Sequence, residues 1–394
     1  MTRASRADLI GPSWGDWRGG WQSRRYLLCR GETWSLHDGG DEVGRWPNLR
    51  DAVRRLWSAR EIRDGHPWAV GWIGYEEAAR LAGRLPFRRQ GEAAPGGWLL
   101  LEPDRAEPGP EEKSGCPSAT DTRWSLDDAA FRDGVAAIRE KIAEGGVYQV
   151  NLSRRLSVDG WEGSLRPLLE VAARNQAPGH LAHFDFDGGE LVCASMELLL
   201  RRRGRALETC PIKGTRPRGG SPGEDRRWAE ELDADPKERA ELAMIVDLER
   251  NDLGRIAEPG TVRVEEPGSV CSFATVHHRV GRVVATARPG LEWWEVVGAM
   301  APGGSVTGCP KRAAMAVIAE LEPVARGPFA GVLGVVAGNG DLELALPIRT
   351  AWKAGSRLEF AAGCGIVWES DPDAEERESR LKVSRWLELV GCPA

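Results

Sequence analysis

The fold class follows from the stretch Val147-Tyr148-Gln149-Val150-Asn151-Leu152-Ser153-Arg154-Arg155-Leu156. Apolar and polar residues alternate along most of this stretch, which is the pattern of a β-strand with one buried face. Residues 126–142, just before it, have the spacing of an amphipathic helix, and Gly145-Gly146 supplies an end signal for that helix. A helix that leads directly into a strand indicates a mixed α/β chain.

The same two patterns recur on both sides of this stretch, without a repeat at any fixed period. The expected strands are 68–75, 147–156, 191–200, 262–264, 274–285, 331–337, 344–351, 358–362 and 365–367. The expected helices are 76–82, 126–142, 224–248, 291–300, 311–321 and 375–390. Many strands with interspersed helices predict an α/β (α+β) fold class.

One segment interrupts this succession of elements. Residues 103–122 are rich in proline, glycine and charge, which is typical of a loop or linker. The segment would separate an N-terminal part, residues 1–102, from a larger region, residues 123–394.

Composition excludes several classes of partner. The 394 residues are 41% hydrophobic and 28% charged, and the formal net charge is −6. A nucleic acid or an anionic membrane would call for a basic face, which this balance does not favour. No apolar run approaches the roughly 18 residues that a membrane span needs, no signal peptide is visible, and the eight cysteines lack metal or disulfide spacing. We therefore expect a cytoplasmic protein with no nucleic-acid or membrane partner.

The most informative single residue is Lys213, in Pro211-Ile212-Lys213-Gly214-Thr215. Proline restricts the backbone and glycine permits conformations that other residues resist, so this segment can aim one side chain at one point. A lysine held in this way can serve as a neutral nucleophile. Taken alone, the pentapeptide fits a surface lysine in a turn better than a nucleophile, and motifs elsewhere in the chain must reverse that balance.

Two pairs of carboxylates are candidates for a metal site. Glu238 and Glu241 lie three residues apart on one predicted helix, and Glu375 and Glu378 repeat the spacing on the last helix. Mg²⁺ prefers carboxylates and water, and it keeps room for an anionic ligand. The same spacing also decorates ordinary exposed helices, and other motifs must decide between the two interpretations.

Three further features suit a small substrate with several negative charges. The glycine-rich segment 303–311 leads into a helix N-terminus, which favours an anion, although its spacing is not that of a P-loop. Arg349, at a predicted strand end, could pair with a carboxylate, and the expected turn 362–365 could offer backbone N–H groups. Glu197, on a strand that could raise its pKa by burial, is a candidate acid or base.

These segments, in this order, resemble the chorismate-utilising enzymes. The resemblance runs from about residue 127 to residue 389. It rests on the motifs 147–153, 211–215, 244–252, 303–311, 348–350, 362–367 and 375–382, with weaker support from 71–76. It implies a single large domain of two packed antiparallel β-sheets with helices outside, to which the N-terminal segment contributes strands of one sheet.

Within that family, two positions separate the reactions. Members that add water carry a lysine base where this chain has Gln149, and a glutamine cannot take a proton from water. Anthranilate synthases carry alanine at the position of Lys213, where the aminodeoxychorismate synthase component I group has lysine. The resemblance therefore implies attack of Lys213 on C2 of chorismate, addition of ammonia at C4 and release of 4-amino-4-deoxychorismate, the precursor of p-aminobenzoate and folate.

The resemblance also implies roles for individual residues. Lys213 would be the covalent nucleophile, and Glu197 the acid that helps the C4 hydroxyl to leave. Glu241 and Glu378 would bind Mg²⁺, assisted by Glu238 and Glu375. The implied substrate-binding residues are Gln149, Gly214, Thr215, His278, Thr307, Arg349, Ala362, Gly363, Gly365 and Lys382.

Alternatives remain at this point. The chain could be an anthranilate synthase component I or another chorismate-aminating enzyme of secondary metabolism, and product identity would decide. It could also be a regulatory binding subunit without turnover. No segment resembles a glutamine amidotransferase, so we expect ammonia from a separate glutaminase subunit.

Overall fold

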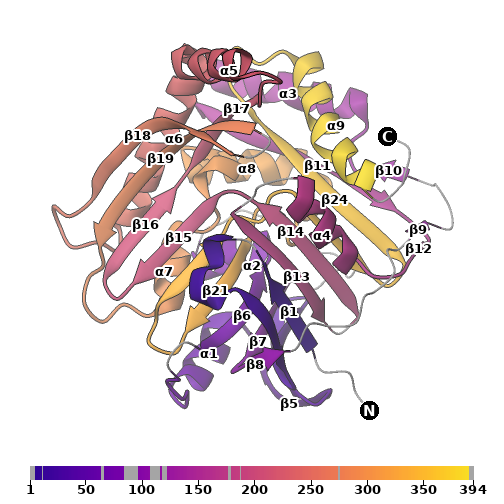
Figure 1. Cartoon of the computed structure of the whole chain (residues 1–394), viewed down its shortest axis with the longest axis vertical. Helices are drawn as coiled ribbons and strands as arrows, with labels where there is room; N and C mark the ends of the chain where they lie inside the picture. Colours follow the sequence, from indigo (N-terminus) through magenta and orange to yellow (C-terminus); the bar gives the residue numbers. More distant parts are fainter. Residues whose placement is uncertain are drawn as a thin grey trace.

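A computed structural model describes residues 5–10, 12–63, 66–83, 96–106, 116–117, 122–175, 179–186, 188–273 and 276–389. Two large antiparallel sheets pack face to face, and most of the helices lie on their outer sides (Figure 1). The structure has the expected fold class, a mixed α and β chain in one large unit. Within the described residues, no helix combines the length and the apolar character needed to cross a membrane.

The first sheet, called sheet 1, contains the quoted stretch as its strand β11. Its strands in spatial order are β10 (Thr122–Trp124), β11 (Gln149–Val158), β24 (Arg357–Ile366), β23 (Thr350–Ala354), β14 (Gly189–Ser195), β13 (His180–Phe186), β1 (Ser5–Leu9), β2 (Gly19–Ser23) and β8 (Asp104–Ala106), with β20 (Gly308–Cys309) paired to β11. The short pair β9 (Cys116–Pro117) and β12 (Trp161–Glu162) lies outside this sheet.

The second sheet, called sheet 2, carries the lysine segment at one edge. Its strands in spatial order are β17 (Ile212–Pro217), β19 (Val276–Thr286), β16 (Ala206–Cys210), β15 (Leu198–Arg203), β22 (Leu342–Ala345), β21 (Val332–Ala337), β6 (Pro67–Ile73), β7 (Gly97–Leu101), β3 (Arg25–Arg30), β4 (Thr33–Asp38) and β5 (Asp41–Trp46), with β18 (Arg263–Ser272) paired to β19.

Aromatic side chains join the two sheets in the largest apolar core. Phe184 and Phe186 on β13 of sheet 1 meet Trp98 and Trp72 of sheet 2, with ring centroids 5.8 Å apart in the Phe184–Trp98 and Phe186–Trp72 contacts. Large aromatic rings supply much buried area, so these contacts fix one sheet against the other.

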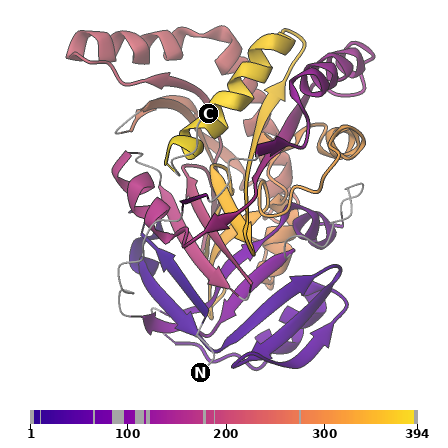
Figure 2. The ribbon, with the colours of Figure 1, turned by 90° about the vertical axis from the view of Figure 1, so that its right-hand side faces the viewer.

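Helices cover the ends and outer faces of the sheets. They are α1 (Leu49–Trp57), α2 (Tyr75–Leu81), α3 (Asp128–Ala143), α4 (Arg166–Asn175), α5 (Pro222–Ala234), α6 (Pro236–Gly254), α7 (Trp293–Met300), α8 (Lys311–Leu321) and α9 (Pro372–Leu389). Short 3₁₀ turns lie at Pro12–Trp17 and Gly304–Val306. In Figure 2 the N-terminal strands lie at one end of the molecule, and α5, α6 and α9 lie at the other.

Two of the places where the chain passes from one sheet to the other lie side by side. It leaves β14 of sheet 1 and continues as β15 of sheet 2 through Met196-Glu197, and it leaves β22 of sheet 2 and continues as β23 of sheet 1 through residues 346–349. Because β14 pairs with β23 and β15 with β22, the crossings are neighbours. Hydrogen bonds tie them together, from Leu346 N to Glu197 O at 3.1 Å and from Ala194 N to Arg349 O at 3.0 Å.

These crossings correct two expected strands. The single strands predicted over 191–200 and 344–351 are each broken into two strands of different sheets. Mostly apolar residues lie on both sides of each break, and one charged residue at each break, Glu197 or Arg349, does not by itself mark a boundary between strands. Pro347 was an available signal, since proline is rare inside a central strand.

Two further expectations are wrong in detail. The helix predicted over 224–248 is two helices, because Asp235 caps the start of α6 and Pro236 follows at its first position. The turn predicted at 362–365 lies inside the continuous strand β24, where Gly363 pairs with Ser153 and Gly365 with Asn151. These glycines serve close approach of neighbouring side chains instead of a change of direction.

The N-terminal residues do not keep to one sheet. Strands β1 and β2 belong to sheet 1 and β3 to β7 belong to sheet 2, whereas a contribution to one sheet was expected. Strand β8, at Asp104–Ala106, lies within the predicted linker and also belongs to sheet 1. Most of the predicted linker, 107–115 and 118–121, lies outside the described residues. The division of the chain at 103–122 therefore stays a prediction.

Candidate active site

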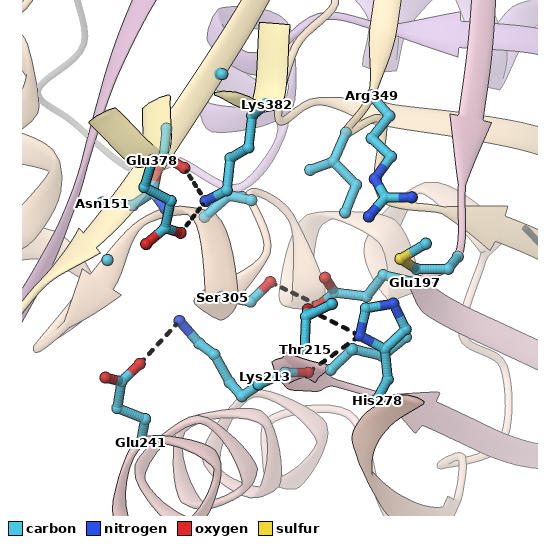
Figure 3. Close-up of a pocket in the computed structure, with 18 of the residues that line it drawn as sticks. Asn151, Glu197, Lys213, Thr215, Glu241, His278, Ser305, Arg349, Glu378 and Lys382 are labelled. Atoms are coloured by element: carbon cyan, nitrogen blue, oxygen red, sulfur yellow. Dashed lines mark hydrogen bonds and ion pairs between the residues drawn. The ribbon is translucent and has the colours of Figure 1, made fainter. Parts of the chain in front are cut away.

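A cavity of about 570 Å³ opens between the two sheets, below α6 and α9. Sheet 1 lines it through β11 and β24, sheet 2 through β17 and β19, and the two crossings add Glu197 and Arg349. Figure 3 shows Lys213, Glu197, Arg349 and Lys382 directed toward one common space. Side chains that are far apart in sequence thus share one enclosure.

Lys213 projects from a bulge at the edge of sheet 2. The register of β17 against β19 shifts between Lys213 and Thr215, and Gly214 at the bulge has φ +69°. A Cβ on Gly214 would stand 2.8 Å from Leu232 Cδ1 and 3.0 Å from Glu238 Oε2, so only glycine fits there. The Lys213 side chain is 13% exposed, and its Nζ lies 3.7 Å from Glu241 Oε2.

Glu197 lies where the first crossing meets the cavity. Its carboxyl accepts a hydrogen bond from Ser305 Oγ at 2.6 Å, and the residue is 4% exposed. Burial raises the pKa of Glu197 to about 7, against the Ser305 hydrogen bond and the charge of Lys213, which both lower it. A carboxyl with this pKa can hold a proton near neutral pH and release it to a leaving group.

His278, on β19, is a neutral hydrogen-bonding group. Burial, together with the charge of Arg349, lowers the pKa of His278 to about 4. Its Nδ1 donates a hydrogen bond to Gly214 O at 3.0 Å and lies 3.1 Å from Thr215 Oγ1. The imidazole Nε2 has no partner among the described residues, so it can accept a hydrogen bond inside the cavity.

Arg349 and Lys382 bring positive charge to the opposite wall. Arg349 sits at the second crossing with φ +50°, a conformation uncommon for residues other than glycine. Lys382, on α9, donates from Nζ to Gly363 O at 2.9 Å and to Glu378 Oε1 at 2.7 Å. The two cations suit an anionic ligand.

Four carboxylates line the same cavity from α6 and α9, namely Glu238, Glu241, Glu375 and Glu378. Burial raises the pKa of Glu238 and of Glu375, and the neighbouring charges of Glu241 and Glu378 respectively raise them further. Burial would also raise the pKa of Glu378, but the charge and hydrogen bond of Lys382 hold it below its ordinary value. A hard cation would relieve the repulsion within each pair of carboxylates, so the donor chemistry of each pair fits Mg²⁺.

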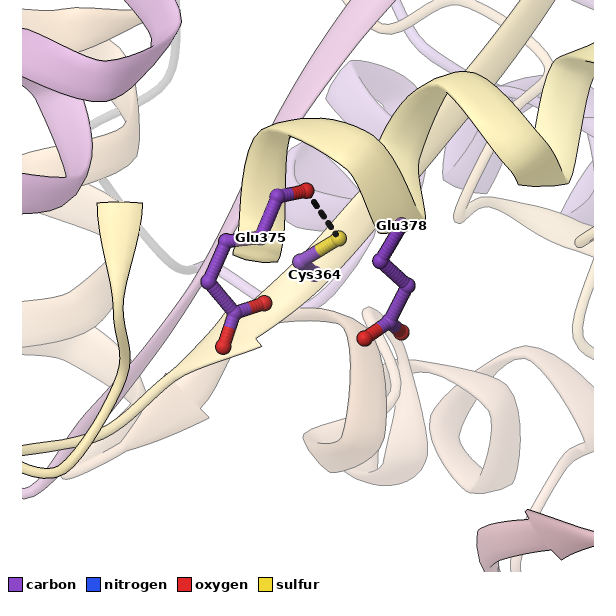
Figure 4. A group of neighbouring side chains, drawn as sticks. All are labelled: Cys364, Glu375 and Glu378. Atoms are coloured by element: carbon purple, nitrogen blue, oxygen red, sulfur yellow. Dashed lines mark hydrogen bonds between the residues drawn. The ribbon is translucent and has the colours of Figure 1, made fainter. Parts of the chain in front are cut away.

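A thiol lies beside two of these carboxylates. The possible ligand atoms of Cys364, Glu375 and Glu378 lie within 4.8 Å of one another (Figure 4). Burial raises the pKa of Cys364 to about 12, and its Sγ donates to Glu375 O at 3.5 Å. A protonated thiol is a poor ligand for a hard cation, so only the carboxylate oxygen atoms of the cluster would suit one.

Most of the residues predicted from sequence meet in this cavity. Its lining includes Glu197, Lys213, Gly214, Thr215, Glu238, Glu241, His278, Arg349, Ala362, Gly363, Gly365, Glu375, Glu378 and Lys382. The walls formed by the described residues include neither Gln149 nor Thr307. Gln149 is fully buried behind Gly365, and Thr307 Oγ1 donates to Gly303 O at 2.8 Å.

Sequence reasoning missed several wall residues. Asn151 lies two positions from Gln149 on the same face of β11, and Ser305 lies inside the glycine-rich segment 303–311, so both were within quoted motifs. Lys237, which lies 3.9 Å from Glu241, begins α6 and could have been found from the helix break at Pro236.

Comparison with known proteins identifies a family to which the sequence is similar. A model of the family described as chorismate binding enzyme matches residues 100–388. The anthranilate synthase component 1 of Streptomyces coelicolor is 41% identical over 304 residues, which cover 73% of this chain and 58% of that protein. The aminodeoxychorismate synthase component 1 of Bacillus subtilis is 40% identical over 266 residues, covering 66% of this chain and 56% of that protein.

The chain thus spans little more than half the length of these two curated relatives. Its fold matches solved structures more completely. Anthranilate synthase component I from Streptococcus pneumoniae TIGR4 superposes with a TM-score of 0.77 at 24% identity, over 99% of this chain and 93% of that one. MenF, the menaquinone-specific isochorismate synthase from Escherichia coli, gives 0.71 at 21% identity, over 99% and 95% of the two chains.

The family model covers both crossings, the lysine segment and the two helices that carry the carboxylates. At 37% identity, a third relative, the anthranilate synthase component 1 of Aeropyrum pernix, aligns with 85% of this chain and 77% of its own length. The elements that build this cavity therefore lie within the matched family region, and the chain belongs to the family of chorismate binding enzymes.

Proposed function

We propose that this chain is an aminodeoxychorismate synthase component I, which joins ammonia to C4 of chorismate through a covalent intermediate on Lys213. The observation that carries the proposal is the pairing of an amine and a proton-holding carboxyl in one cavity. Lys213 and Glu197 both line it, and the charge of Lys213 acts on the pKa of Glu197. A nucleophile and an acid are the two groups that a displacement of hydroxide requires.

The first step forms a bond between Lys213 Nζ and C2 of chorismate. The two ring double bonds shift, the C4–O bond breaks, and the proton of Glu197 converts the leaving hydroxide to water. The Nζ nitrogen then loses one proton, which restores Glu197. The protein gains the mass of chorismate less one water.

In the second step ammonia forms a bond to C4. The double bonds shift back, the bond between Nζ and C2 breaks, and the proton lost by the ammonia nitrogen balances the one that the departing Nζ regains. The product is 4-amino-4-deoxychorismate. Lys213 is left free for the next turnover.

The remaining wall residues orient the substrate. Arg349 and Lys382 supply positive charge for its carboxylates, and the bare Nε2 of neutral His278 accepts a hydrogen bond. Mg²⁺ would be held by Glu241 and Glu378, with Glu238 and Glu375 beside them, and would neutralise a carboxylate of the substrate.

The names of the relatives support two products. Anthranilate synthase is the alternative, since the Streptomyces and Aeropyrum proteins carry that name. Lys213 favours aminodeoxychorismate, because direct attack of ammonia at C2 has no use for a lysine amine in the same place. We further propose that a separate glutaminase subunit supplies the ammonia, in the cytoplasm, for p-aminobenzoate and folate synthesis.

The test compares the native protein with Lys213→Ala. Each is incubated with chorismate, Mg²⁺ and a high concentration of ammonium at alkaline pH, and products are identified by mass and chromatography. We expect aminodeoxychorismate from the native protein and a loss of at least about a hundredfold in the variant. Anthranilate from the native protein would overturn the proposal.

A further inference from the structure

Gln149 is a buried amide whose polar atoms have no use in the fold. The residue is 0% exposed, and neither Oε1 nor Nε2 has a hydrogen-bond partner among the described residues. Buried amides are nearly always satisfied, because an unpartnered one destabilises the folded state. An exception of this kind at the back of an active site calls for a functional explanation.

The amide faces Lys213 across a space that a glycine leaves open. Asn151 of β11 pairs with Gly365 of β24, so Gln149 lies beside that glycine. A Cβ on Gly365 would stand 2.5 Å from Gln149 Nε2 and 3.1 Å from Lys213 Nζ. The amide of Gln149 and the amine of Lys213 therefore border the same small volume, which any other residue at 365 would fill.

Lys213 also lies near a carboxylate. Its Nζ lies 3.7 Å from Glu241, a carboxylate that fits the Mg²⁺ site. A cation on Glu241 competes with Lys213 for that carboxylate. The amine then needs another hydrogen-bond acceptor, and the unpartnered amide is within reach of the side chain.

We propose that Gln149 is a positioning residue for Lys213, whose Nζ donates a hydrogen bond to the Gln149 amide oxygen and so aims its lone pair into the cavity. A half-turn of the amide exchanges the places of Oε1 and Nε2, so the oxygen can occupy the point nearest the amine. The amide accepts this hydrogen without adding a negative charge beside the nucleophile. The inference rests on the proposed function, because it assigns Gln149 to the covalent step.

This role differs from the substrate contact that the sequence analysis expected. Gln149 lies behind the wall and acts through Lys213, so its loss should slow bond formation without weakening chorismate binding. Gln149→Met is the direct test, because methionine has nearly the same length and no amide. Replacing an unpartnered buried amide with an apolar chain should leave the melting temperature unchanged or raise it.

The measurement is a single turnover without ammonium. Protein in excess is mixed with chorismate and Mg²⁺, quenched at intervals, and weighed intact by mass spectrometry. We expect the adduct of chorismate less water on native protein, and formation at least about tenfold slower in Gln149→Met. The dissociation constant for chorismate should stay within about twofold of the native value, since no wall residue has changed. The decay of the adduct on adding ammonium completes the comparison.

Gly365→Ala is a second variant, which keeps the amide but blocks its contact with the amine. Its methyl group would enter the space between the amide and the amine and displace the amide, so it should slow the same step although glutamine is kept at 149. Adduct formation at the native rate in Gln149→Met would overturn the inference, as would a loss of chorismate affinity in that variant that accounts for its slower rate. Absence of any adduct on native protein would instead overturn the proposed function, and this inference with it.

Discussion

At the scale of single residues, the site combines groups whose protonation is set by burial. Burial disfavours the charged form of both groups. It raises the pKa of Glu197, which keeps a proton near neutral pH, and it lowers the pKa of His278, which stays neutral. An acid that can donate a proton and an imidazole whose bare Nε2 can accept a hydrogen bond thus line one cavity. Neither property is visible in the residue names alone.

The pH dependence of adduct formation should report Glu197. Its protonated form is the active one, so the rate should fall as pH rises through about 7. Glu197→Gln should lower the rate by about 10²–10⁴-fold and remove this dependence. Ser305→Ala removes a hydrogen bond that lowers the pKa of Glu197, so the fall should move to higher pH in that variant. Rapid-quench rates across pH provide the measurement, and an unmoved midpoint in Ser305→Ala would contradict this assignment.

Long motifs allowed most wall residues to be predicted from sequence. Lys213, Gly214 and Thr215 are contiguous, and their bulge follows from one glycine. Gln149 and Asn151 could not be separated in this way, because both lie on the same strand face and only packing decides which reaches the cavity. Residue types in a motif indicate the chemistry, but exposure depends on the neighbouring strand.

At the scale of elements, the break between α5 and α6 determines where two carboxylates lie. Asp235 accepts hydrogen bonds from Lys237 N at 3.0 Å and Glu238 N at 3.2 Å, and this cap starts α6. A continuous helix through this point would direct Glu238 and Glu241 elsewhere. The break is therefore part of the candidate metal site.

Asp235→Ala should remove the N-terminal cap of α6. We expect a loss of about 1 kcal/mol in the free energy of unfolding, measured in urea, together with weaker Mg²⁺ binding. Ser221→Ala is the matched control, because Ser221 caps α5 through Glu224 N at 3.3 Å, and α5 carries none of the four carboxylates. Equal effects of the two variants on Mg²⁺ affinity would show that the cap of α6 has no special role.

Elements with local signals were predictable, and elements set by distant partners were not. Helix α8 has the predicted bounds, Lys311–Leu321, because proline precedes it and its apolar spacing is regular. The partition of 191–200 and 344–351 between two sheets depends on pairing between segments about 150 residues apart, which no local pattern encodes. The strand order of each sheet was equally out of reach.

At the scale of the whole molecule, α6 and α9 come from distant parts of the chain and would share one cation. A ligand that binds only the folded state raises its stability, by about 2.7 kcal/mol at a hundred times the dissociation constant. Mg²⁺ should therefore raise the melting temperature of the native protein. Glu378→Gln should abolish most of that rise, whereas Glu140→Gln, at an exposed position of α3, should leave it intact.

Two probes can follow this unfolding, far-ultraviolet circular dichroism for the sheets and tryptophan fluorescence for the aromatic core. Because the N-terminal strands belong to both sheets, we expect the two signals to change together in one transition, with and without Mg²⁺. A separate early transition in fluorescence would contradict this coupling.

The two neighbouring crossings have a consequence for how such enzymes diverge. Glu197 and Arg349 belong to neither sheet, so their positions follow the way one sheet rests on the other. Substitutions among the interlocking aromatic rings, such as Trp72 and Phe186, can shift both groups without altering any polar residue. Heritable variation in turnover can therefore accumulate far from the chemistry, in positions that a comparison of active-site residues would count as silent.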